Sequence, residues 1–273
     1  MPLIDNHVHA GDKYGPVENL IERMDAHGVT HAVIVQHLGQ FNNGYLAESV
    51  ARYSERFWGV ALVDLELPDA PKTLRWWLKN QKLHGVRLPA VSLSRRPDVW
   101  QMAVDSHAVI SLAGLQPRDL GQIARLKSFL DANPRARVKI EHLGHPDPFE
   151  PPPHITNQRI MELAGYKNVY LQLSAPFMLS KKEYPYPDML PFIEMARKSF
   201  GSYRLIWGSC YPVVDQYMTY RQSLEWVDTF GLNDFQRDAF LSGNAIRLWD
   251  PRRKKVAAIS GAEDASAEED AKE

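Results

Sequence analysis

Two histidines lie two residues apart near the N-terminus, where His7 and His9 belong to the segment DNHVH. Alternate residues of a β-strand face the same side, so a strand here would point both imidazoles into one site. A lone strand histidine is more often a satisfied core residue, but a pair at this spacing favours a functional site. A third histidine, His142, ends another strand-like segment, in EHLGHP. Three imidazoles that converge in this way could bind a metal ion or help to activate water.

The chain has a single cysteine, Cys210, in the segment WGSCYP. No intramolecular disulfide can form, which suits a reducing compartment. If the segment before Cys210 is the last strand of a closed barrel, its thiol lies beside the first strand and therefore beside His7 and His9. A His/Cys set of this kind suits zinc.

Five further side chains are expected near the same site because each follows or lies within a predicted strand or overhanging loop: Arg87, His37, Gln116, His145 and Tyr186. The planar guanidinium of Arg87 suits a substrate carboxylate, although a structural ion pair explains it equally well. The other four are candidate substrate-binding residues, with solvated loop residues as the alternative.

The elements that must position these side chains are a series of strand and helix units. Eight short runs rich in β-branched residues predict strands at 3–9, 31–36, 58–63, 85–89, 109–113, 137–142, 169–174 and 204–208. Helical spacing of apolar residues predicts helices at 17–27, 45–57, 71–81, 120–132, 159–165, 189–200, 220–230 and 234–249. The strands are nearly continuous apolar runs, as in parallel sheets that are covered on both sides.

Eight such units predict a single-domain (β/α)8 barrel, an α/β TIM barrel, over residues 1–251. No glycine-rich phosphate-binding segment follows the first strand, which argues against a dinucleotide-binding fold. Residues 252–273 are charged and poor in aromatic side chains, so we expect a disordered tail. In a barrel of this type the strand C-termini build the active site, where His7, His9, His142 and Cys210 would meet.

Composition excludes several classes of partner. The net charge is −1, with 32 basic and 33 acidic residues, so neither a nucleic acid nor an anionic membrane is expected as a partner. The N-terminus does not resemble a signal peptide, and no apolar run is long enough to span a membrane. We expect a cytoplasmic protein that acts on a small molecule. The oligomeric state stays open, a homo-oligomer included.

Several segments together resemble the amidohydrolase-2 family, and especially its lactonase-like branch. The DNHVH opening, EHLGHP and RLIWGSCYP carry the resemblance, and MDAHGVTHAVIVQ, HGVRLPA and GNAIRLW add to it in the expected order. The resemblance implies catalytic roles for His7, His9, His142 and Cys210, which could also be ligands of a divalent metal. Zinc would be the first choice, and a metal-free site is an alternative.

One position departs from the family pattern, because Cys210 stands where the family has an aspartate. An unperturbed thiol is mostly protonated at pH 7 and serves as a base or ligand only as the thiolate. Three hypotheses remain: a thiolate ligand or base, a cysteine nucleophile, and a substitution that has weakened the chemistry.

The resemblance implies a hydrolase that opens a small carboxylated lactone, or a cyclic amide, by attack of an activated water. Decarboxylation or hydration of an aromatic-derived acid, as in aromatic compound degradation, is the rival reaction. A barrel that binds a small molecule without turning it over is the third hypothesis.

Overall fold

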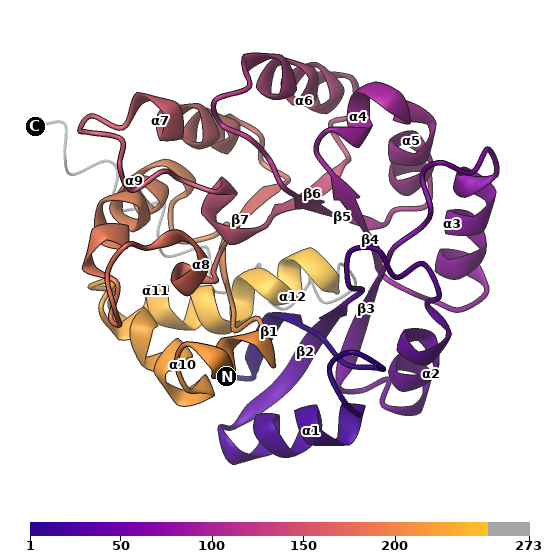
Figure 1. Cartoon of the computed structure of the whole chain (residues 1–273), viewed down its shortest axis with the longest axis horizontal. Helices are drawn as coiled ribbons and strands as arrows, with labels where there is room; N and C mark the ends of the chain where they lie inside the picture. Colours follow the sequence, from indigo (N-terminus) through magenta and orange to yellow (C-terminus); the bar gives the residue numbers. More distant parts are fainter. Residues whose placement is uncertain (251–273) are drawn as a thin grey trace, which may run out of the picture.

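The computed structural model describes residues 1–250. Its strands form one eight-stranded parallel sheet in the order β1 to β8 (Figure 1). The strands are β1 (Leu3–Val8), β2 (Val29–Val35), β3 (Phe57–Ala61), β4 (Gly85–Pro89), β5 (Val109–Ala113), β6 (Arg137–Ile140), β7 (Val169–Ser174) and β8 (Leu205–Gly208). Each of the eight predicted strands is confirmed, with ends that differ by two residues or fewer.

The sheet closes on itself where β8 meets β1. Beyond the end of β8, Tyr211 forms a parallel bridge with Val8, and the His9 amide donates to the Tyr211 carbonyl at 2.8 Å. The Cys210 amide donates to the His7 carbonyl at 2.8 Å. The chain is therefore a (β/α)8 barrel, as predicted, and closure itself joins the cysteine loop to the histidine strand.

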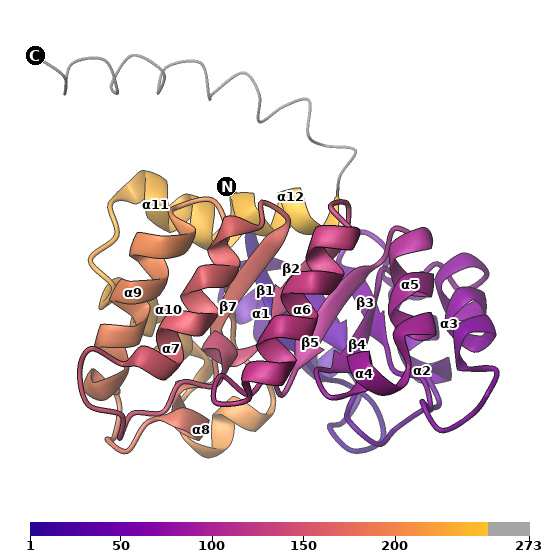
Figure 2. The ribbon, with the colours of Figure 1, turned by 90° about the horizontal axis from the view of Figure 1, so that it is seen from above.

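Most of the helices cover the outside of the barrel (Figure 1). In chain order, the helices are α1 (Val17–Ala26), α2 (Gly44–Arg52), α3 (Ala70–Lys79), α4 (Ser92–Arg95), α5 (Pro97–Asp105), α6 (Leu120–Ala132), α7 (Ile155–Met161), α8 (Pro176–Leu179), α9 (Leu190–Phe200), α10 (Tyr220–Asp228), α11 (Asp234–Asp238) and α12 (Asn244–Trp249). The exceptions are α8 and α12, which lie at the two ends of the barrel (Figure 2). The sequence prediction missed α4, α5 and α8. The helix expected at 45–57 ends at Arg52, because Phe57 already pairs with Ala32 in the sheet.

The helix expected at 234–249 is interrupted by a π-helical turn, Ala239–Gly243, between α11 and α12. Beyond this turn, α12 lies across the end of the barrel where the strands begin, and α8 lies at the opposite end (Figure 2). Leu248 and Trp249 of α12 pack against barrel residues such as Ile4 and Val109. One end of the barrel is thereby filled with apolar side chains, which leaves the C-terminal ends of the strands for chemistry.

None of the helices within residues 1–250 is both long enough and apolar enough to cross a lipid bilayer. The tail predicted at 252–273 lies outside the described residues.

Candidate active site

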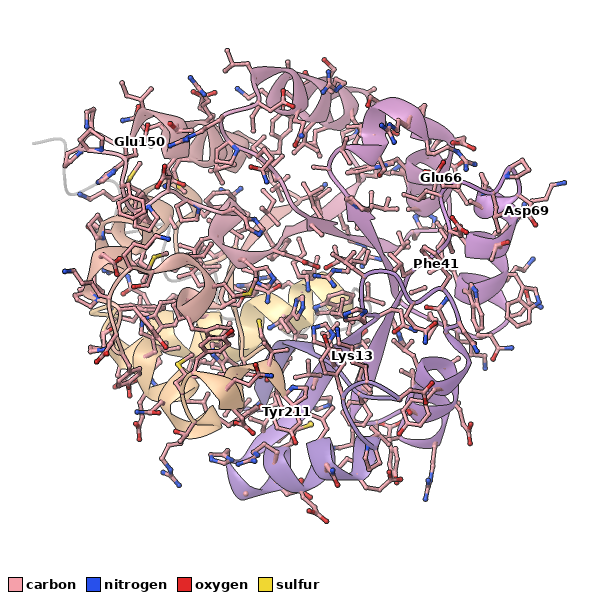
Figure 3. The ribbon with its side chains drawn as sticks, in the orientation of Figure 1. Lys13, Phe41, Glu66, Asp69, Glu150 and Tyr211 are labelled. Atoms are coloured by element: carbon pink, nitrogen blue, oxygen red, sulfur yellow. The ribbon has the colours of Figure 1, made fainter. Side chains whose placement is uncertain are left out.

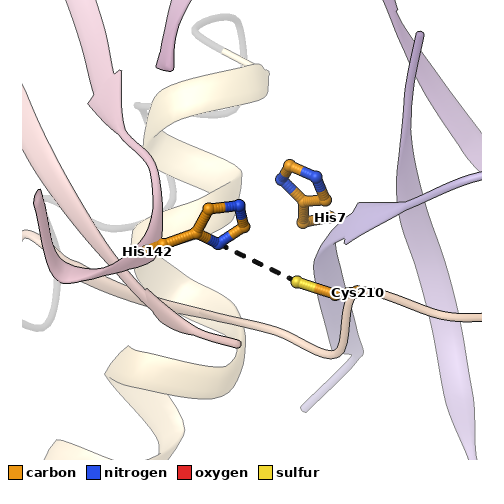
Figure 4. Close-up of side chains that lie close together, drawn as sticks. All are labelled: His7, His142 and Cys210. Atoms are coloured by element: carbon orange, nitrogen blue, oxygen red, sulfur yellow. Dashed lines mark hydrogen bonds between the residues drawn. The ribbon is translucent and has the colours of Figure 1, made fainter. Parts of the chain in front are cut away.

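Three donor side chains converge at the C-terminal end of the barrel. The ligand atoms of His7, His142 and Cys210 all lie within 4.8 Å of one another, and all three residues are buried. Figure 4 shows them approaching one another from β1 and from the segments that follow β6 and β8. The His7 ring centroid lies 5.0 Å from that of His142 and 4.9 Å from that of His9. The structure therefore brings the three histidines together, as predicted. His9 lies beside the donor trio, which consists of His7, His142 and Cys210.

His142 was expected to end its strand, and the structure corrects this, whereas Cys210 follows the last strand as predicted. Strand β6 stops at Ile140 and β8 at Gly208, so each side chain lies two residues further along the chain. Both residues adopt left-handed backbone conformations, with φ of 51° at His142 and 65° at Cys210. Such conformations cost roughly 1–3 kcal/mol in a non-glycine residue and concentrate at functional sites. The two turns direct the imidazole and the thiol across the barrel opening towards His7.

The buried carboxylate of Asp5 holds β1 against the cysteine loop. It accepts hydrogen bonds from the amides of His7, at 3.1 Å, and Ser209, at 2.9 Å, and from the Tyr220 hydroxyl, at 2.8 Å. Gly208 permits the close approach, because a Cβ there would lie 2.5 Å from Gln172 Nε2 and 3.0 Å from His7 Cβ. Burial raises the pKa of Asp5 to about 6. Together these contacts fix the spacing between His7 and Cys210.

The hydrogen bonds of the imidazoles determine which nitrogens are available. His9 donates from Nδ1 to the Val35 carbonyl at 2.7 Å, which leaves the lone pair of a neutral ring on Nε2. His142 Nδ1 shares a 2.8 Å hydrogen bond with Ser174 Oγ. His7 Nδ1 is buried and has no hydrogen-bond partner among residues 1–250. Burial lowers the pKa of His9 and of His142 to about 3, and that of His7 well below its ordinary value. All three rings are neutral at pH 7, which is the form that binds metals.

A buried carboxylate, Glu141, lies beneath the histidines and was missed by the sequence prediction. Arg87 donates to it from Nη2 at 2.7 Å and from Nε at 3.1 Å, and Ser111 Oγ donates at 2.6 Å. Its oxygens lie 4.0 Å from His7 Nδ1 and 3.8 Å from His142 Nε2. Burial alone would raise the pKa of Glu141, but the positive charge of Arg87 holds it well below the ordinary value. Glu141 is therefore ionised and faces the donor trio.

Arg87 therefore forms a structural ion pair, which is one of the two roles that the sequence left open. Two of its three guanidinium nitrogens bind Glu141, and Nη1 contacts the Gln36 carbonyl at 3.4 Å. A second buried cation, Lys139, donates to the Asn6 carbonyl at 3.0 Å, next to His7 in the chain. Lys139 and Glu141 alternate with apolar residues in KIE, a period-2 pattern that could have revealed two polar side chains directed into the barrel.

The other four predicted residues are placed differently from one another. His145 is half-buried, with its ring centroid 5.6 Å from that of His142. His37 is half-buried beyond the end of β2. Gln116 is exposed. Tyr186 is 4% exposed and packs in the hydrophobic core, so it does not overhang the opening as a free loop residue would. The structure thus brings His145 to the histidine cluster and puts Tyr186 into the core.

Comparisons with known proteins identify the family of this chain. A family model described as amidohydrolase matches residues 12–250. An L-fucono-1,5-lactonase from Burkholderia ambifaria is 31% identical over 215 residues, which cover 73% of this chain and 70% of that protein. The chain belongs to the amidohydrolase family. The resemblance inferred from the sequence motifs is thereby confirmed.

Solved structures share the fold of this amidohydrolase. A probable 2-pyrone-4,6-dicarboxylic acid hydrolase from Acinetobacter baumannii, with citric acid bound, matches with a TM-score of 0.75 and 23% identity over 91% of this chain and 99% of that one. An amidohydrolase from Burkholderia multivorans with bound zinc matches with a TM-score of 0.75 and 19% identity over the same shares of the two chains.

The thiol of this amidohydrolase cannot act as a free thiolate at neutral pH. Burial, and then the nearby Asp5 carboxylate, raise the pKa of Cys210 far above its ordinary range. Its Sγ lies 3.9 Å from His142 Nδ1, but that imidazole is itself a very weak base. Without a cation to displace its proton, Cys210 stays neutral, so the hypotheses of a free thiolate base or nucleophile lose their electrostatic support.

The donor set fits a divalent metal ion. Two neutral imidazoles and a thiol that can lose its proton to a cation are typical zinc ligands, and the unpartnered Nδ1 of His7 is a buried polar atom that a ligand would satisfy. The charge of the Glu141 carboxylate also favours a cation beside it. His7, His142 and Cys210 would hold the metal, with His9 adjacent to them.

The neutral histidines predict that stability falls in mild acid. His9 and His142 have pKa values of about 3 in the folded chain against an ordinary 6.5. The stability they contribute is complete above pH 6.5 and is lost as the pH falls towards 3, on the order of 4 kcal/mol for each histidine. Asp5 acts in the opposite direction. Its pKa is raised to about 6 in the folded chain, so protonation of Asp5 increases the folding stability as the pH falls below 6. We expect the urea midpoint, followed by circular dichroism with a chelator present, to fall steeply between pH 6.5 and 4.

The matched variant is His142→Gln, in which one of the three buried imidazoles with lowered pKa is gone. Its stability at pH 7 sets the baseline, and its loss of stability between pH 6.5 and 4 should be clearly smaller than that of the wild type. A wild-type midpoint that does not change over this range would contradict the assignment of neutral buried imidazoles.

Proposed function

We propose that this protein hydrolyses a small lactone, by attack of a water molecule at the cluster of His7, His142 and Cys210. The observation that carries the proposal is the buried trio of donors at the open end of the barrel, with the ionised Glu141 behind it. Buried polar atoms arranged around one point are the usual mark of an active site in this fold. The L-fucono-1,5-lactonase relative supports a lactone as the substrate class.

The residues of the site have separate roles in ester hydrolysis. His9 can orient the attacking water by accepting a hydrogen bond at Nε2, because its Nδ1 proton is held by the Val35 carbonyl. The negative charge of Glu141 lies 4.0 Å from His7 Nδ1 and 3.8 Å from His142 Nε2, where it would stabilise a cation held between these rings. A divalent cation, when bound by His7, His142 and Cys210, would supply Lewis-acid polarisation of the ester carbonyl and a lower pKa for bound water. We propose zinc as that cation.

The test combines metal analysis with a substrate panel. Full-length protein, purified without added metal, should contain close to one equivalent of zinc or another divalent ion by mass spectrometry. It should open lactones, both carboxylated and neutral, with activity that a chelator removes and zinc restores. Assays of carbon dioxide release from aromatic acids run in parallel.

The outcomes separate the parts of the proposal. Lactone turnover that survives complete metal removal would overturn the metal assignment but leave the hydrolase intact. Carbon dioxide release without lactone opening would overturn the proposed reaction. Failure of the metal-loaded protein to turn over any lactone would favour a barrel that binds small molecules without chemistry.

A further inference from the structure

A cavity of about 280 Å³ lies between the segments that follow β1 and β2, and one of its lining residues, Tyr14, stacks on His9 of the histidine cluster. Its walls include Lys13, Tyr14, Gln36, His37 and Asn42. Figure 3 shows Lys13 over the opening of the barrel and not on its outer rim. The volume is close to the lower limit of about 300 Å³ for small-molecule pockets, so it suits one part of a small substrate and not a second large ligand.

Tyr14 connects this cavity to the histidine cluster. Its ring stacks on His9, with centroids 4.8 Å apart and an interplanar angle of 20°, and it lies 5.5 Å from the ring of His37. On the other wall, the Gln36 carbonyl accepts the contact from Arg87 Nη1. A molecule whose ester carbonyl reaches the trio could therefore extend a substituent past Tyr14 into the cavity.

The cavity presents hydrogen-bond donors and a positive charge. Lys13 Nζ lies 2.6 Å from His37 Nε2 and 5.4 Å from the centroid of Tyr14. An ammonium group can only donate, so His37 accepts at Nε2 and carries its remaining proton on Nδ1. Burial, and then the charges of Lys13 and Arg87, lower the pKa of His37, which keeps the ring neutral as this contact requires.

No carboxylate within residues 1–250 forms an ion pair with Lys13. Asp12 also lines the cavity, but it is exposed and makes no such contact. Lys13 thus keeps two N–H donors for a ligand while its side chain is held over an aromatic ring. Arg87, the residue that the sequence suggested for a substrate carboxylate, is already bound to Glu141.

We infer that the cavity between Lys13, Tyr14 and His37 binds a carboxylate substituent of the substrate, and that Lys13 determines the preference for anionic over neutral lactones. This inference rests on the proposed lactone hydrolysis and narrows its substrate class. The ammonium group of Lys13 donates to the carboxylate, His37 holds the ammonium in place, and Tyr14 separates the charged group from the reacting ester.

The first experiment compares Lys13→Met with wild type on a pair of lactones that differ only in a ring carboxylate. The loss of one charge-assisted hydrogen bond should lower kcat/KM for the carboxylated lactone by about tenfold to a hundredfold, mainly through KM. The neutral lactone should change by less than about twofold, and Lys13→Arg should recover part of the loss. Equal losses on both lactones, or no loss on either, would overturn the inference.

Lys181→Met is the matched control, because Lys181 is also an exposed lysine over an aromatic ring, with Nζ 4.9 Å from the centroid of Phe149. It does not line the cavity, so its removal should affect both lactones alike and by less than about twofold. A selective loss with the carboxylated lactone in this variant would show that diffuse surface charge, and not the cavity, sets the preference.

A binding measurement separates this inference from the proposed reaction. Calorimetry with tetrahydropyran-2-carboxylate, which has no ester to hydrolyse, should show binding to the wild type that weakens at least about tenfold in Lys13→Met. The neutral alcohol tetrahydropyran-2-methanol should bind both proteins equally. If no lactone is opened but this pattern holds, the subsite stands and the proposed reaction fails. If the wild type does not prefer the carboxylate, the subsite fails whatever the enzyme hydrolyses.

Discussion

Replacing Cys210 with serine is expected to lower kcat/KM for lactone hydrolysis by about 100-fold or more and to remove most of the bound metal. Loss of a group that merely supports a ligand costs about 10- to 100-fold in metal affinity or activity, and loss of the ligand itself should cost at least as much. A serine hydroxyl is nearly the size of the thiol but hardly ionises, even beside a cation. Steady-state kinetics and metal content per chain, measured on the same preparation, check this expectation.

Cys210→Asp is the informative partner of that variant, because it introduces a carboxylate, the group that the family resemblance implies at this position. It should retain metal and keep activity within about tenfold of wild type, since a carboxylate is also a good zinc ligand. If Cys210 were instead a nucleophile, the aspartate variant would fail and the wild type would accumulate a thioester detectable by mass spectrometry. If only the aspartate variant were active, the cysteine would mark weakened chemistry. Full activity in Cys210→Ser would contradict every catalytic role for the thiol.

Breaking the buried ion pair of Arg87 and Glu141 is expected to destabilise the fold by about 3–5 kcal/mol. Either single variant, Arg87→Met or Glu141→Gln, leaves one partner of a fully enclosed pair without its counterpart. The double variant should be more stable than the sum of the two losses predicts, by about 2 kcal/mol or more, because no unpaired charge is left behind. Urea unfolding of the four proteins closes the double-mutant cycle.

The surface pair of Arg52 and Glu18 provides the matched control. Its side chains are 64% and 46% exposed, at an N···O distance of 3.0 Å, so Arg52→Met should cost less than about 1 kcal/mol. A similar cost at both pairs, or additivity within about 0.5 kcal/mol for Arg87 and Glu141, would show that the enclosed pair is not energetically coupled.

The barrel could be predicted because its strands are short, separate runs rich in buried apolar and β-branched residues. The missed helices have local reasons: α4 has only four residues, and α5 begins at Pro97 directly after the irregular Arg96. A periodicity search needs more turns than α4 supplies. The four-residue helices α4 and α8 are too short for such a search, whereas α5 has nine residues and begins at a proline, so its helical signal was present and was missed.

The parts of the site whose positions follow from residue spacing along the strands and from barrel closure could be predicted. His7 and His9 share a strand face, so their proximity follows from period 2, and the closure of a barrel brings Cys210 to the first strand. The partner of Arg87 could not be found in this way, because Glu141 is 54 residues away along the chain and meets it only across the barrel. The left-handed turns at His142 and Cys210 were also hidden, because a single histidine or cysteine does not by itself specify this conformation, although histidine is enriched in it.

The hydrogen bond from Trp249 Nε1 to Asn6 Oδ1, at 2.9 Å, links residues 243 positions apart. During synthesis on the ribosome, β1 emerges together with His7 and His9 long before β8 and α12, the elements that pair with β1 and contact it. Such long-range closure is slow compared with local helix formation. The site is therefore completed late in folding, and a chain that stops just before Trp249 would carry all three histidines but would lack the contact that holds β1 in place.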